Sequence, residues 1–98
     1  MNIYCLKFIV EPLPENENFG RIKKAVADVW VKSETYDAAI AKALSFFQQY
    51  SYSVLETDPA FSVSTVQQML EKGKSLLPEV VHALDFGIGC HLTGATDG

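Results

Sequence analysis

The sequence has few basic residues, and this shortage excludes several kinds of partner. Eight lysines and arginines stand against twelve aspartates and glutamates, which gives a net charge of −4. Surfaces that follow a nucleic-acid backbone need clustered positive charge, so we expect no nucleic-acid partner. Anionic lipid headgroups also repel an acidic chain, so we expect no docking on a membrane.

Long apolar segments and cysteine are scarce as well. No apolar run approaches the ~20 residues that cross a bilayer, and Lys7 interrupts the apolar N-terminal stretch. Glu11 and Pro12 follow that stretch in place of a small-residue cleavage site, which predicts that there is no signal peptide. Cys5 and Cys90 are far apart and lack CxxC spacing, so neither a disulfide scaffold nor a zinc site is expected. The sequence therefore predicts a cytoplasmic protein without metal or cofactor.

The chain does contain enough apolar residues to form one core. It has 98 residues, of which 48% are hydrophobic, as in a typical single globular domain. Three of the six glycines fall after residue 87, and the chain ends in small polar residues. We therefore expect one domain over residues 1–93 and a disordered tail over residues 94–98.

Two strands are predicted in the first third of the chain. Residues 2–10 are apolar on both faces of an extended chain, apart from Lys7, which is typical of a strand inside a covered sheet. Residues 22–32 alternate between two kinds of face. One face has small apolar residues suited to lie beneath a helix: Ala25, Ala27, Val29 and Val31. The other face carries Val26, Asp28, Trp30 and Lys32.

A helix is predicted over residues 36–50, where apolar residues recur at three- and four-residue spacing. Thr35 is suited to cap its N-terminus by accepting a hydrogen bond from the amide of Asp37 or Ala38. Residues 52–57 then read as a strand that Asp58 and Pro59 end. The predicted fold is α+β, with a ββαβ core made of a three-stranded sheet and one packed helix.

One or two short helices are expected to follow this core. Ser64 and Gln67 fit a capping box at the start of the first helix. Pro78 suits the first turn of a second helix, and Gly87 suits its C-terminal cap. Gly73 separates the two apolar segments.

Catalytic residue types gather only near the C-terminus, at His82, Asp85, Cys90 and His91. A cysteine–histidine pair can supply a nucleophile or bind a transition metal. His82 and Asp85, however, are spaced as a solvated pair on one helix face, and adjacency of Cys90 and His91 does not by itself organise a site. We therefore interpret the cluster as structural and keep a small enzyme or small-molecule-binding protein as the alternative.

Trp30 is the more informative residue, because the alternation places it on the face away from the predicted helix. We expect it to form a surface with Val26 and with Ile3 and Ile9 of the first strand. One helix cannot cover both faces of the sheet. Either the C-terminal helices cover this second face, or another chain does, and exposed aromatic patches commonly mark interfaces.

The segment Val29–Ala39, the alanine-containing helix after it and Tyr52–Glu56 together are similar to a unit found in small uncharacterised bacterial α+β domains. The same stretch resembles the strand-to-helix step of HicB-type antitoxin domains, but the chain lacks their Gly-Tyr and Pro-Asp-Leu segments. The resemblance covers about a third of the chain. It implies a fold neighbourhood and transfers no functional residue.

The leading hypothesis is a non-catalytic protein-interaction module that forms a homodimer through the sheet face or edge bearing Trp30. The negative net charge would suit a basic protein partner, such as a toxin to be neutralised, because opposite charges favour encounter.

Overall fold

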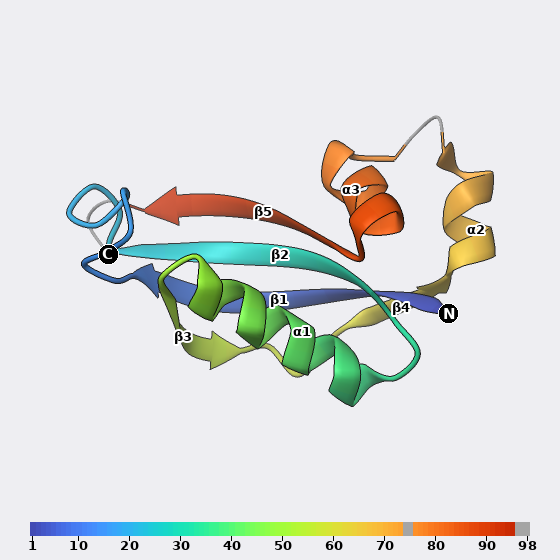
Figure 1. Cartoon of the computed structure of the whole chain (residues 1–98), viewed down its shortest axis with the longest axis horizontal. Coiled ribbons are helices and arrows are strands. Elements are labelled where there is room, and N and C mark those ends of the chain that lie inside the picture. Colours follow the sequence, from blue (N-terminus) through green and yellow to red (C-terminus); the bar gives the residue numbers. More distant parts are fainter. Residues whose placement is uncertain (74–75, 96–98) are drawn as a thin grey trace.

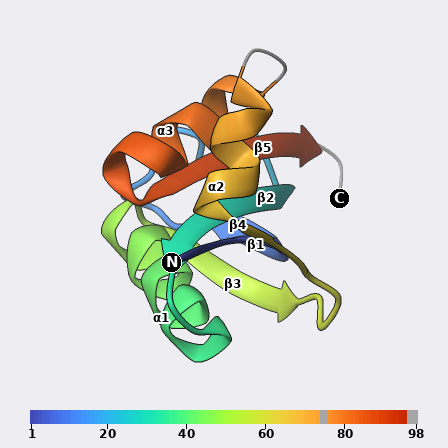
Figure 2. The same cartoon turned by 90° about the vertical axis from the view of Figure 1, so that its right-hand side faces the viewer.

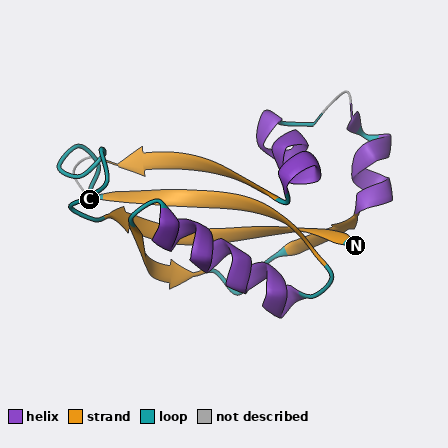
Figure 3. Ribbon diagram, viewed as in Figure 1, coloured by secondary structure: helices purple, strands orange, loops and turns teal. Residues whose placement is uncertain are grey.

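The computed structural model describes residues 1–73 and 76–95 of the chain. Five strands and three helices occur in this described part, and Figure 3 shows how they are distributed. In chain order they are β1 (Asn2–Pro12), β2 (Lys24–Ser33), α1 (Tyr36–Gln49), β3 (Tyr52–Thr57), β4 (Ser62–Thr65), α2 (Val66–Glu71), α3 (Pro78–Phe86) and β5 (Ile88–Ala95).

All strand pairs of the sheet are antiparallel, and the strand order is β3-β1-β2-β5. The short strand β4 pairs with the first residues of β1, beyond the part of β1 that β3 occupies. Figure 1 shows β5 at one edge of the sheet and β3 and β4 on the far side of β1. The α+β class is therefore confirmed, whereas the prediction of a three-stranded sheet was wrong because β4 and β5 add two strands.

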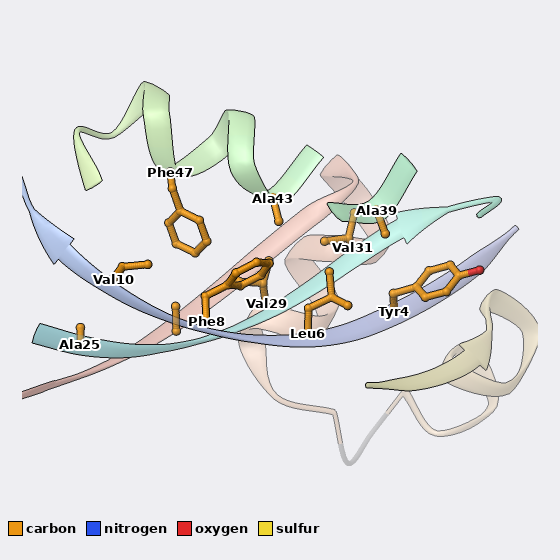
Figure 4. Close-up of a cluster of buried hydrophobic side chains, with 11 residues drawn as sticks. Tyr4, Leu6, Phe8, Val10, Ala25, Val29, Val31, Ala39, Ala43 and Phe47 are labelled. Carbon is orange, nitrogen blue, oxygen red and sulfur yellow. The ribbon is translucent and has the colours of Figure 1, made fainter. Parts of the chain in front are cut away.

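The core lies between α1 and the first face of the sheet. Figure 4 shows side chains from β1 and β2 that point toward α1, whose Ala39, Ala43 and Phe47 point back at them. Phe8 and Phe47 are both buried and meet edge to face, with ring centroids 5.3 Å apart. Burying each such side chain contributes about 1.5–3 kcal/mol. The two alanines leave room for the helix backbone to approach the strands.

The start of α1 matches its prediction. Thr35 has extended backbone angles and its hydroxyl accepts a hydrogen bond from the amide of Ala38, at 3.2 Å. Asp37 lies in the first turn, where a negative charge is favourable beside the positive end of the helix dipole. Local sequence signals are therefore sufficient to fix where this helix begins.

The C-terminal helices agree with prediction in number but not in every boundary. The capping box belongs to Thr65 and Gln68, one residue later than the predicted Ser64 and Gln67, because β4 extends through Thr65 and α2 begins only at Val66. Pro78 does open α3. Gly87 ends α3 with a φ of 95°, in the left-handed region that favours glycine.

The segment after Gly87 forms a strand that the sequence did not predict. The strand β5 runs through Ala95, two residues past the boundary placed at 93, and residues 96–98 of the predicted tail lie outside the described residues. Figure 2 views the molecule from the end that carries the N-terminus and shows α2 and α3 above β1 and β2, with α1 below them. Among the described residues, no helix is both long and apolar enough to span a membrane.

Candidate functional site

The second face of the sheet, opposite α1, includes residues of β1, β2 and β5. The strand register shows which of these residues lie side by side. Trp30 of β2 pairs with Cys5 of β1 on one side and with Gly89 of β5 on the other. The neighbouring positions on this face follow from the same alternation. They are Ile3, Lys7 and Ile9 in β1, Val26, Asp28 and Lys32 in β2, and His91 and Thr93 in β5.

Helix α3 covers one end of this second face. The Lys32 ammonium donates a hydrogen bond to the Leu84 carbonyl oxygen at 2.9 Å. A Cβ atom added at Gly89 would meet the Glu79 carbonyl, so the helix backbone lies directly against β5 there. Ile3, the strand partner of Lys32, is only 2% exposed. The chain's own helix therefore takes part of the surface that the sequence left open.

The other end of the second face remains accessible. Lys7 is exposed, and its cross-strand partner Asp28 is half-buried and carries the opposite charge. Ile9 and Val26 are a half-buried apolar pair one step along the same strands, and Trp30 is also half-buried. We call this surface, formed by the five residues just named, the open half-face.

Of the four residues assigned to an interface from the sequence, three lie on the open half-face. Trp30, Val26 and Ile9 share one side of the sheet and keep part of their surface exposed. Ile3 is on the same side but lies in the interior. Because only 2% of its surface is exposed, Ile3 does not belong to the open half-face.

The four residues of the C-terminal cluster are only partly brought together. His82 and Cys90 line one cavity of about 390 Å³, whose wall also includes Phe46 and Tyr50 of α1. Asp85 is not part of that wall. His91 lies on the opposite side of the sheet from Cys90, and its Nδ1 is 3.2 Å from Glu79 Oε1.

The surroundings of the two cavity residues affect the protonation of each side chain. Burial raises the pKa of the Cys90 thiol to about 11, and the carboxylates of Asp28 and Glu79 add smaller effects in the same direction. The thiol therefore stays protonated near neutral pH, whereas the thiolate is the nucleophilic form. The His82 Nδ1 lies 2.7 Å from the Ile88 carbonyl oxygen, and only an Nδ1–H donor can make that hydrogen bond.

No three histidine, cysteine or acidic side chains gather as metal ligands in residues 1–73 and 76–95. Cys5 and Cys90 are both free and lie on opposite faces of the sheet. Comparisons with protein-family models, curated proteins and solved structures find no match. Function must therefore be inferred from the geometry of this chain alone.

The open edge of the sheet was not predicted from the sequence. Strand β5 pairs with β2 alone among the described residues, so its outer side faces away from the sheet. Residues 91–94 of this strand are exposed. The alternation of apolar and polar residues in this segment was a usable signal, but its two glycines concealed it.

Proposed function

We propose that the chain is a non-catalytic protein-interaction module that forms a homodimer through its sheet. The observation that carries the proposal is the sheet itself, which keeps an open half-face with a half-buried tryptophan and an open edge at β5. Tryptophan is enriched among residues that dominate binding energy at protein interfaces. The C-terminal cluster offers less support for chemistry, because burial raises the pKa of the Cys90 thiol to about 11.

A basic protein is the second partner in this proposal. The chain carries a net charge of −4, and opposite charge on a partner accelerates encounter and disfavours wrong partners. Cytoplasmic location belongs to the same proposal, and the two free cysteines suit a reducing compartment. Binding to a candidate partner is expected to weaken from low to high salt, because salt screens exposed charges.

The homodimer is tested by sedimentation equilibrium of the full chain over the micromolar range. The expected result is a mass that rises with concentration from 10.8 kDa toward twice that value. A mass of 10.8 kDa at every concentration would contradict the homodimer. The basic partner is tested separately through Trp30, the only tryptophan, whose emission should shift when the open half-face is covered.

A second candidate function is the binding of a small, mainly apolar molecule in the cavity between α1 and α3. The observation in its favour is the cavity of about 390 Å³ with Phe46, Tyr50, Ile88 and Cys90 in its wall. Ligand cavities of this size are lined mostly by apolar side chains with a few polar groups. A fragment screen by NMR tests this function, which requires chemical-shift changes confined to the cavity wall.

A further inference from the structure

No strand among the described residues pairs with the outer edge of β5, and the ladder shows which residues carry the outward backbone groups. The Lys32 amide donates to the Gly87 carbonyl oxygen at 2.8 Å, in the same register that pairs β2 with β5. Hydrogen-bonded and non-hydrogen-bonded pairs alternate along an antiparallel ladder. The alternation therefore turns the N–H and C=O groups of every second residue away from β2: Ile88, Cys90, Leu92 and Gly94.

An independent contact agrees with this assignment. The Ile88 carbonyl oxygen accepts a hydrogen bond from His82 Nδ1, which is possible because that carbonyl points away from β2. Helix α3 thus satisfies the first outward carbonyl of the strand. The next outward residue, Cys90, lines the cavity bordered by α1 and α3, and the following two, Leu92 and Gly94, are exposed. Cys90, Leu92 and Gly94 form the remaining outward set, which we call the free edge.

The free edge lacks the features that normally protect an edge strand from pairing. Proteins usually place charged residues, proline, bulges or very short strands at exposed edges. The other edge of the sheet has all of them, with Glu56, Asp58 and Pro59 in or after β3, a register shift between Ile9 and Val10 of β1, and only four residues in β4. Strand β5 contains no acidic residue, lysine, arginine or proline, and its register with β2 is continuous.

We propose that the free edge pairs with the same edge of a second copy of this chain. Two antiparallel β5 strands related by a twofold axis at Leu92 place Cys90 opposite Gly94 of the second copy. This register uses all three outward residues of each copy as hydrogen-bonded pairs, each exchanging two backbone hydrogen bonds. The two sheets then become one continuous sheet. The inference rests on the proposed homodimer and specifies where it forms.

A second copy fits this edge because the residues that would face each other in this pairing are compatible. The register sets a small residue, Gly94, against the larger Cys90, and it sets Leu92 against its own copy. It also places His91 beside Thr93 of the second copy, so no two acidic or two basic residues meet directly. The pairing leaves the open half-face of each copy uncovered and places the two side by side for a further partner.

Sedimentation equilibrium of the full chain with matched variants tests the site. Leu92→Lys places two lysines at the twofold axis and should raise the dimer dissociation constant by about tenfold or more, because like charges opposite each other are destabilising. Leu55→Lys is the control, since Leu55 lies in strand β3, at the opposite edge of the sheet from β5. The exposed fractions of the two leucines are similar, 40% for Leu55 and 36% for Leu92. The control should change the dissociation constant by less than about twofold.

A mixing experiment separates loss of pairing from loss of folding. Leu92→Glu alone should weaken the dimer in the same way, but an equal mixture with Leu92→Lys should restore dimer formation through opposite charges at the axis. Two unfolded variants would give no such rescue. The acrylamide quenching of Trp30 should stay unchanged as the wild-type dimer forms, because the open half-face remains uncovered.

The results distinguish failure of the pairing through β5 from failure of the homodimer itself. If the wild type dimerises and Leu92→Lys remains as dimeric as Leu55→Lys, the free edge is not the interface, while the proposed homodimer stands. A decrease in Trp30 quenching on dimer formation would then move the interface to the open half-face. If the wild type is monomeric at every concentration, both the homodimer and the pairing of β5 are overturned.

Discussion

At the scale of single residues, Gly89 connects the sheet to the helix that covers it. Its missing side chain lets the backbone of Glu79 lie against β5, and Trp30 is its strand partner. In sequence, a glycine in this segment suggested an irregular tail. In the structure it is a point of close approach between two backbones, which is a recognised reason for glycine within a strand.

Substitution of Gly89 by alanine should destabilise the fold. The added Cβ would collide with the Glu79 carbonyl, and overpacking of this kind costs about 1–3 kcal/mol. The free energy of unfolding in urea measures the effect. Gly73→Ala is the matched control, because nothing lies within 4 Å of a Cβ at that position. Equal stability of the two variants would show that α3 does not pack on β5 as described.

The Cys90 thiol should react slowly with alkylating reagents. Its pKa rises from the ordinary 9.0 to about 11. At pH 8 the thiolate fraction, and with it the alkylation rate, should be about a hundredfold below that of the unfolded chain. Mass spectrometry of a Cys5→Ser variant, folded and in urea, measures this rate without a second thiol. Equal alkylation rates in the folded chain and in urea would show that the Cys90 thiol is exposed to solvent.

The same thiol gives a pH dependence of stability with a definite sign. Between pH 9 and pH 11 the folded chain keeps a proton on Cys90 that the unfolded chain loses. Stability contributed by the protonated thiol is therefore complete below pH 9 and falls as the pH rises toward 11. Urea midpoints across this range should fall less steeply for Cys90→Ala than for the wild type.

At the scale of elements, the sequence predicts the strands and helices whose own residues form a clear pattern. A run that is apolar on both faces identifies β1, alternation identifies β2, and the segment that Asp58 and Pro59 end identifies β3. The repeat of apolar residues with Thr35 as cap identifies α1. Strand β4 has only four residues, two of them serine, and it forms because β1 offers a pairing partner. Strand β5 was missed because its glycines are required by Glu79 and by Ile22, which lies against Gly94. Such tertiary contacts leave no local pattern in the sequence.

Helix α1 provides an element-scale prediction. Thr35→Ala removes the hydroxyl that accepts from the Ala38 amide, and loss of such a cap costs about 1 kcal/mol. Because α1 covers the core, the loss should appear in the global unfolding midpoint. Ser45→Ala, at an exposed position within the same helix, is the control and should change stability little. An equal midpoint for Thr35→Ala and the wild type would contradict the capping role.

At the scale of the whole molecule, the sheet order determines which surfaces are available to partners. The connection through α1 carries the chain across β1, so β3 lies beside β1 and leaves β5 as the other edge. The sequence correctly separated the two faces of β2, because alternation assigns faces without knowledge of neighbours. It could not show that α3 would cover the end of the second face near Lys32, nor that an edge would stay open at residues 91–94.

The pairing of β5 with a second copy is tested most directly by hydrogen exchange of individual backbone amides. The amides of Cys90, Leu92 and Gly94 point outward, whereas those of Gly89, His91 and Thr93 bond to β2 and serve as internal controls. At concentrations where the mass is doubled, both sets should be protected. On dilution to the monomer, only the outward set should lose protection. Rapid exchange of the outward amides in the dimer would contradict pairing through β5.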